Sequence, residues 1–330
     1  MNFVFAGTPD FAARVLRELV EAGSRPSLVV SQPDRPKGRG RPTCCPSTVL
    51  EARSLGIDAL QTEDLNDEKT VEMMAASGAE ALVIASFGQL LRPSVLERFL
   101  CLNIHASLLP AYRGAAPVER AIAAGEERIG VTIMRVTEPL DEGPWALKCD
   151  MSVSLRDDAG SVTEALAVLG AMGMGQVLTG LDDGTVVWRE QRGETNYAHK
   201  LCAEDTVFNP ALSARALHDR VRSLSPCVGV RAQSGSVELK VWRTWPYGLP
   251  GLEPVPGPAV GLAGERGRVV IAGEHLYVGC SAGVLELLFV QPVGRPRMQV
   301  SAFLRGYGAR LGETIGPVVR AAPDDELECG

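Results

Sequence analysis

The chain has 330 residues, of which 45% are hydrophobic and 22% charged, and its formal net charge is −7 at pH 7. This composition is typical of a soluble globular protein and excludes a disordered or fibrous chain. The length allows two domains of ordinary size. No apolar run approaches about 18 residues, so we expect no membrane-spanning segment.

The charge is distributed unevenly along the chain. Residues 1–206 carry a net charge of −9, whereas residues 207–330 carry +2. Four acidic residues lie within 324–328, so the rest of the second part carries +6. A basic module attached to an acidic one can bind a polyanion locally.

The eight cysteines show no metal-binding or redox spacing. Cys44 and Cys45 are adjacent, and the other six are scattered without a C-x-x-C pair. We therefore predict no metal site. The chain enters an apolar run directly, without the basic flank and cleavage site of a secretion signal. A reducing, cytoplasmic location with free thiols is expected.

Short apolar runs alternate with helical periodicity in the first half of the chain. Strands are predicted at 3–6, 27–31, 80–86, 102–105 and 130–136, with helical stretches between them. This alternation predicts an α/β fold with a doubly wound, mostly parallel, Rossmann-like sheet. Ligands of such sheets bind outside the carboxyl ends of the strands. Gly7 alone is a poor match to G-x-G-x-x-G, so a dinucleotide site is not favoured.

The second half has a different pattern. A strand at 151–154 and a long core helix at 161–181 are followed by a charged stretch without periodicity at 189–206, which predicts a linker. Helices are then predicted at 211–222 and 301–307. Five short strands, at 228–232, 237–242, 268–272, 276–280 and 284–290, predict a smaller, OB-like β-barrel.

Three complementary polar side chains are expected near the ends of two neighbouring strands. Asn103 and His105 are two residues apart and so face the same side of the sheet. Asp141 follows the next strand. An amide can stabilise an oxyanion, an imidazole can move a proton, and a carboxylate can orient the imidazole. A lone histidine at a strand end is more often structural, but the three groups together favour acyl transfer to an amine.

A basic loop follows the second predicted strand. Residues 32–42 contain two glycines and three prolines, which disfavour regular structure, and the cations Arg35, Lys37, Arg39 and Arg41 against Asp34 alone. The loop is either a solvated surface segment or a contact for a phosphate backbone.

Several segments, taken with their order and spacing, closely resemble the methionyl-tRNA formyltransferase family. They are FAGTPDFA at 5–12, QPDRP at 32–36, NIHASLLP at 103–110, RGAAP at 113–117, GVTIM at 130–134, LDEG at 140–143, NYAHKL at 196–201 and LFVQP at 288–292. Other folate-dependent formyltransferases, which act on glycinamide ribonucleotide or amino sugars, share the Asn, His and Asp trio. The RGAAP segment, the basic loop and the basic second half favour the tRNA enzymes.

The resemblance implies that 10-formyltetrahydrofolate is the formyl donor and the methionyl amine on initiator tRNA the acceptor. It implies catalytic roles for Asn103, His105 and Asp141, and our hypothesis is that Asn103 and His105 stabilise the oxyanion. The residues that it implies for the folate are Ser107, Leu108, Leu109, Pro110, Phe87, Gly88, Leu91 and Leu140. Those implied for tRNA are Arg35, Lys37, Arg39 and Arg41.

Four parts of the chain follow from these patterns. We expect a catalytic formyltransferase domain at 1–188, a linker at 189–206, a tRNA-binding barrel at 207–322 and an acidic tail at 323–330. Family habit implies a monomer. Two alternatives remain open: an enzyme that formylates a nucleotide-linked amino sugar, and an RNA-binding module without activity.

Overall fold

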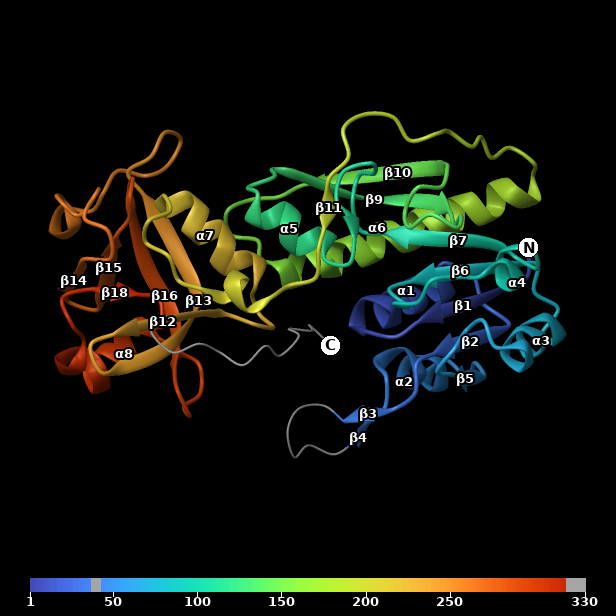
Figure 1. Cartoon of the computed structure of the whole chain (residues 1–330), viewed down its shortest axis with the longest axis horizontal. Helices are drawn as coiled ribbons and strands as arrows, with labels where there is room; N and C mark the ends of the chain where they lie inside the picture. The colour runs from blue at the N-terminus through green and yellow to red at the C-terminus, as the bar shows by residue number, and fades with distance from the viewer. Residues whose placement is uncertain (37–42, 319–330) are drawn as a thin grey trace.

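The computed structural model describes residues 1–36 and 43–318 and contains two large sheets, one in each half of the chain (Figure 1). The strand order of the first is β10-β9-β7-β6-β1-β2-β5. Its strands are β1 (Phe3–Gly7), β2 (Leu28–Ser31), β5 (Ala59–Gln61), β6 (Ala81–Ala85), β7 (Leu100–His105), β9 (Arg128–Arg135) and β10 (Trp145–Ser152). Strands β1, β2, β5, β6 and β7 are parallel, and β9 and β10 form an antiparallel edge. The predicted mostly parallel sheet is confirmed.

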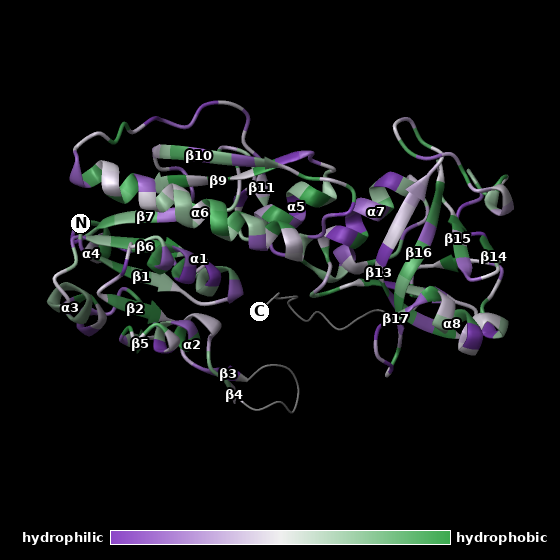
Figure 2. Ribbon diagram, turned by 180° about the vertical axis from the view of Figure 1, so that it is seen from behind, coloured by the Kyte–Doolittle hydropathy of each residue, from purple (hydrophilic) through white to green (hydrophobic). Residues whose placement is uncertain are grey.

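Helices cover both faces of this sheet because alternate residues of each strand face opposite sides. Phe3 and Phe5 of β1 belong to one apolar cluster, with α1 and α6, whereas Val4 and Ala6 belong to another, with α3 and α4. The helices are α1 (Asp10–Glu21), α2 (Ser47–Ser54), α3 (Glu68–Ala76), α4 (Pro93–Leu96), α5 (Pro117–Ala123) and α6 (Ala159–Asp182). Figure 2 colours the central strands β1 and β6 mostly as hydrophobic, as expected for strands buried on both faces.

Helix α6, Ala159–Asp182, confirms the long core helix predicted at 161–181. By length and composition it could cross a membrane, and half of its most apolar window is buried. Its buried residues, including Leu166, Ala171 and Met174, pack in the same cluster as α1 and β9. The apolar stripe of α6 is thus accounted for by the core of the first domain.

The second sheet is antiparallel, with the order β14-β15-β16-β13-β12-β18, and β17 pairs with β16. Its strands are β12 (Val230–Ser234), β13 (Val237–Tyr247), β14 (Val269–Ala272), β15 (His275–Gly279), β16 (Val284–Pro292), β17 (Met298–Gln299) and β18 (Ile315–Gly316). Helices α7 (Ala214–Ser223) and α8 (Val300–Tyr307) and the 3-10 turns at Ala203–Thr206, Gly257–Ala259 and Gly308–Arg310 accompany it. All five strands predicted in this half overlap an observed strand.

The second sheet curls toward closure. The pairing of β13 with β16 shifts register on both sides of Arg243, and such irregularities bend a strand. The two edges approach each other where Arg268, just before β14, bridges Thr314, just before β18. The sheet is therefore a curled antiparallel structure, consistent with the predicted barrel.

Two short ladders lie outside the large sheets. Strands β3 (Arg35–Pro36) and β4 (Thr43–Cys44) flank the basic loop, and β8 (Arg113–Gly114) pairs in parallel with β11 (Tyr197–Ala198). The second ladder brings the stretch predicted as a linker onto the loop that follows β7. The acidic tail predicted at 323–330 lies outside the described residues.

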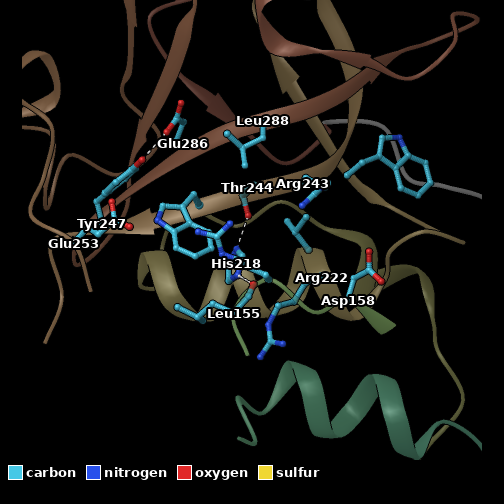
Figure 3. A pocket seen from close by; sticks show the side chains of 14 residues that line it. Leu155, Asp158, His218, Arg222, Arg243, Thr244, Tyr247, Glu253, Glu286 and Leu288 are labelled. Carbon is cyan, nitrogen blue, oxygen red and sulfur yellow. Dashed lines mark hydrogen bonds between the residues drawn. The ribbon is translucent and has the colours of Figure 1, made fainter. Parts of the chain in front are cut away.

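The two halves are joined by a polar contact beside a hollow of about 300 Å³ between α7, β13, β16 and the segment that joins β10 to α6 (Figure 3). The imidazole of His218 is hydrogen-bonded through Nε2 to the Leu155 carbonyl and through Nδ1 to the Thr244 hydroxyl, both at 2.9 Å. Arg222 donates to the carbonyls of Ser154 and Asp157, at 3.2 and 3.1 Å. Both side chains are buried, so these hydrogen bonds fix the position of each side chain.

The contact should weaken in mild acid. Burial lowers the pKa of His218 from its ordinary value near 6.5 to about 4. Between these two values the unfolded chain binds a proton at this histidine and the folded chain does not, so stability is full above pH 6.5 and declines toward pH 4. We expect the free energy of unfolding to fall by about 2 kcal/mol from pH 7 to pH 5 because of His218.

Urea unfolding at both pH values checks this expectation. The charged groups around His218 are Asp219, Arg215 and Arg222, and they are unchanged in a His218→Gln variant. Because glutamine does not titrate, the variant should lose about 2 kcal/mol less than the wild type on acidification. Equal losses in the two proteins would refute the assignment to His218.

Candidate active site

Asn103 and His105 lie at the carboxyl end of β7, which points toward the second domain (Figure 1). Asn103 pairs with Ile84 of β6 on one side and Met134 of β9 on the other, so its position is set by the centre of the sheet. Leu102 and Ile104 point into the cluster with α6. Asn103 and His105 therefore face the opposite side, where Phe87, Leu91 and Val136 pack.

The imidazole of His105 is buried and oriented from both sides. Its Nε2 lies 2.9 Å from the carbonyl oxygen of Tyr112, which only accepts, so Nε2 carries the proton of that bond. Its Nδ1 lies 3.7 Å from Oδ1 of Asp141. That separation is too long for a direct hydrogen bond. Nδ1 can accept or donate a proton, and it lies beside the carboxylate.

Asp141 is held by its backbone and by its second carboxylate oxygen. Oδ2 accepts from the Gly114 N–H at 2.9 Å, while Oδ1 faces His105. Its φ is +53°, in the left-handed region, which aspartate and asparagine tolerate better than most residues. Gly143 allows the loop to pass close to β9, because a Cβ there would lie 1.9 Å from the Arg135 carbonyl oxygen.

The route by which Asp141 reaches His105 differs from the expected one. Strand β9 runs antiparallel to β7, with Thr132 opposite His105 and Arg135 opposite Leu102, so β9 ends away from the histidine. The loop between β9 and β10 then folds back to the site, where Gly114 N–H meets Asp141. The loop between β9 and β10, and not the ends of two adjacent strands, therefore brings Asp141 to Asn103 and His105.

The side chain of Asn103 differs from its neighbours in having no hydrogen-bond partner anywhere in the described parts of the chain. It is half-buried. An amide N–H that is held by a central strand and is not engaged by the protein can bind a carbonyl oxygen of a substrate.

The segment 107–110, predicted to contact folate, is anchored by its polar groups. Thr132 Oγ1 donates to the Ser107 carbonyl at 2.7 Å and accepts from the Leu109 N–H at 3.1 Å. The Ser107 hydroxyl donates to the Ala111 carbonyl, and Lys148 donates to the Leu109 carbonyl. The side chains of Ser107 and Leu109 are buried, while Leu108 and Pro110 remain half-exposed.

The other residues predicted for folate flank the same face of the sheet. Phe87 is buried and its carbonyl accepts from Gln32 Nε2 at 2.7 Å, whereas Gly88 next to it is exposed. Leu140 is 51% exposed, beside Asp141. Leu91 lines a hollow of about 670 Å³ whose other lining residues include Leu90 and Pro93. Neither this hollow nor the one beside His218 is lined by the trio.

Of the cations predicted to bind tRNA, only Arg35 can be placed. It is exposed on β3, opposite Cys44 of β4. Lys37, Arg39 and Arg41 lie outside the described residues. Within the part of the chain that is described, no cluster of three or more His, Cys, Asp and Glu side chains could hold a metal ion.

Sequence reasoning missed the groups that hold the trio. The carbonyl of Tyr112 and the N–H of Gly114 are backbone atoms and have no side-chain signature. Asn196 accepts from the Tyr112 N–H with its side chain and from the Arg113 N–H, at 3.1 Å, with its carbonyl. Both segments carry sequence motifs, RGAAP and NYAHKL, but nothing in the sequence indicates that they pair.

Solved structures share this fold at low sequence identity. The N-formyltransferase from Helicobacter canadensis in complex with folinic acid and dTDP-3-aminofucose has a TM-score of 0.61 and 14% identity, over 88% of this chain and 99% of that one. HypX from Aquifex aeolicus in complex with tetrahydrofolic acid also has a TM-score of 0.61 and 14% identity, over 97% of this chain and 51% of that one. At this identity the likeness concerns the fold alone.

Sequence comparisons reach further. The formyl transferase family matches residues 1–178, and the formyl transferase C-terminal domain family matches residues 200–308. The methionyl-tRNA formyltransferase of Aromatoleum aromaticum is 37% identical over 97% of this chain and 98% of its own length, and that of Heliobacterium modesticaldum is 39% identical over 97% and 99%. The chain therefore belongs to the methionyl-tRNA formyltransferase family.

Proposed function

We propose that this protein transfers the formyl group of 10-formyltetrahydrofolate to the amino group of methionyl initiator tRNA. The single observation that carries the chemistry is the arrangement at the end of β7. His105 is held between Tyr112 and Asp141, while the neighbouring Asn103 amide is left without a partner among the described residues. Membership of the family supplies the donor class and the acceptor.

The folate donor fits the face of the sheet onto which Asn103 points. The exposed Gly88 backbone, the exposed side chain of Leu140 and the half-exposed Leu108 offer apolar and backbone contacts to a flat ring. The buried Ser107 and Leu109 would contribute through the rigid backbone that Thr132 anchors. We assign Phe87 and Leu91 to the support of this wall and Pro110 to its rim.

Asn103 and His105 would act on the formyl oxygen. As the neutral amine attacks the formyl carbon, negative charge develops on that oxygen, and the Asn103 N–H would stabilise it. The imidazole of His105, whose orientation the Tyr112 carbonyl fixes, would supply a second contact through Nδ1 once that nitrogen has taken up the amine proton.

Asp141 would position the imidazole of His105 and help to move the proton. In this reaction the amine forms a bond to the formyl carbon, and the bond from that carbon to the folate nitrogen breaks. The proton lost by the amine is transferred to the folate nitrogen. With 3.7 Å between Nδ1 and Oδ1, a water molecule can link the imidazole, the carboxylate and the amine.

The acceptor is supported by positive charge on both domains. Arg35 is exposed at the base of the basic loop. In the second half of the chain, Arg297 is exposed and lies 3.4 Å from the centre of the buried Trp242 ring, so the ring holds this cation at the surface. Phosphates attract such cations.

Four finer assignments accompany this proposal. We take residues 1–188 as the catalytic domain, 189–206 as the linker, and 207–322 as an OB-like barrel that binds tRNA. The loop cations Lys37, Arg39 and Arg41 would join Arg35 on the phosphate backbone. The protein would work as a monomer, in the cytoplasm where translation starts.

A competition among acceptors tests the proposal. With 10-formyltetrahydrofolate as donor, formylation of charged initiator tRNA should exceed that of glycinamide ribonucleotide or of a dTDP-linked amino sugar by at least about 10³-fold in kcat/KM, because only tRNA uses the basic surfaces. Binding of the tRNA should weaken steeply as salt rises. Preference for a small acceptor, or binding that salt does not affect, would refute the tRNA assignment.

A further inference from the structure

We propose that Gln191, in the segment between the two domains, is a positioning residue that sets the catalytic carboxylate against the imidazole. The inference rests on the proposed function, since it assigns Gln191 to the site that performs the transfer. Its role would be to join the loop after β7 to the loop after β9. Two other contacts also link these loops, the Arg113–Glu142 ion pair and the bond from the Gly114 N–H to the Asp141 carboxylate.

One amide group makes the link. Gln191 Nε2 donates to the carbonyl oxygens of Asp141, at 2.7 Å, and Gly143, at 2.9 Å. Its Oε1 accepts from Nε and Nη2 of Arg113, at 3.2 and 2.8 Å. The donor end thus holds the loop after β9, and the acceptor end holds the loop after β7.

Each of these loops positions one half of the catalytic pair. Arg113 lies between Tyr112, whose carbonyl binds His105, and Gly114, whose N–H binds Asp141. On the other side, the backbone that Gln191 holds is that of Asp141 itself. Because an aspartate side chain is short, a displacement of its backbone moves the carboxylate by a similar distance.

Gln191 is itself fixed from both directions along the chain. Two residues earlier, Arg189 exchanges backbone hydrogen bonds with Trp145, at 2.8 and 2.9 Å. Later in the segment, β11 pairs with β8, and the Ala198 carbonyl accepts from the N–H of Ala115 and of Ala116. The side chain of Gln191 is half-buried between these anchors. The segment can therefore transmit a fixed position to the two loops.

The substitution Gln191→Glu removes the donor end of the amide and keeps the acceptor end. Glutamate has the same shape and can accept from Arg113, but it cannot donate to the two carbonyls. The Asp141 loop should therefore be released while the Arg113 loop stays held. We expect kcat for formyl transfer to fall by about 10- to 100-fold, since a shift of about 1 Å in a catalytic group has effects of this size. KM for charged tRNA should change by less than about threefold.

A double-mutant cycle identifies the route of the effect. If Gln191 acts through the carboxylate, Gln191→Glu should change kcat by less than about threefold in an Asp141→Asn background. The matched control is Gln176→Glu, which places the same new charge on an exposed position of α6 and should retain wild-type kcat. Thermal unfolding of all variants shows whether each is folded.

Two results would overturn the inference: wild-type kcat for folded Gln191→Glu, or the same fold-loss with and without the Asp141 charge. If Gln191→Glu does not fold, Gln191→Met tests the same cycle without adding charge. Failure of the proposed function is a separate outcome, because the wild-type protein itself would then transfer no formyl group to charged tRNA.

Discussion

Asp141→Asn should lower kcat for formyl transfer by about 10³-fold, the middle of the range for losing a group that assists proton movement. Asparagine can accept the Gly114 N–H bond and tolerates the left-handed φ of +53°, so the loop should keep its shape. What disappears is the negative charge 3.7 Å from Nδ1 of His105. The affinity for charged tRNA should stay within about twofold, because the charge does not bind the acceptor.

Single-turnover kinetics with saturating donor measure the first quantity, and filter binding of charged tRNA measures the second. Asp58→Asn, at an exposed position of the same domain, is the matched control and should behave as wild type. A loss of affinity as large as the loss of kcat would place Asp141 in binding and not in proton transfer.

Asn103→Leu should lower kcat by about 10²- to 10³-fold, the loss that follows removal of one oxyanion donor. The change should leave the protein as stable as before. Leucine has a similar size, and the amide it replaces has no hydrogen-bond partner within residues 1–36 and 43–318, so no buried group loses its partner.

Activity measured beside the melting temperature tests this pair of expectations. For the Asn103 assignment the decisive result is a large loss of kcat at an unchanged melting temperature. A variant that transfers the formyl group at the wild-type rate would exclude Asn103 as the oxyanion donor. A variant that melts far below the wild type would show that the amide is structural.

The sequence predicted the central elements well because their signals are local. The strand that carries Asn103 and His105 is an apolar run bounded by polar residues, and the period of two places both side chains on one face. Periodicity likewise predicts the long helix α6 and, with the Gly and Pro between them, five strands of the second sheet, β12 to β16.

The edges of the first sheet were harder to predict. Strand β10 begins at Trp145, six residues before the expected start, because its residues are only half-buried and show little alternation of burial. Strand β5 has three residues, too few for a periodic pattern. Nothing in the run 130–136 specifies that β9 is antiparallel, which depends on pairing with β7 and β10.

The site was predictable as a list of reactive residues and not as a geometry. Asn103, His105 and Asp141 have side chains whose chemistry is visible in the sequence. Their supports are backbone groups of Tyr112 and Gly114 and the amide of Gln191, which is 50 residues from Asp141. Such contacts depend on the tertiary fold, and a charged stretch without periodicity looks like a linker whether or not it returns to the site.

The most direct measurement is transfer of a labelled formyl group from 10-formyltetrahydrofolate to charged initiator tRNA by the wild-type protein. We expect labelled N-formylmethionyl-tRNA to form with many turnovers, and to form no faster than background when the methionyl amine is blocked. Absence of labelled product, with folded protein and charged tRNA that binds it, would contradict the proposed function.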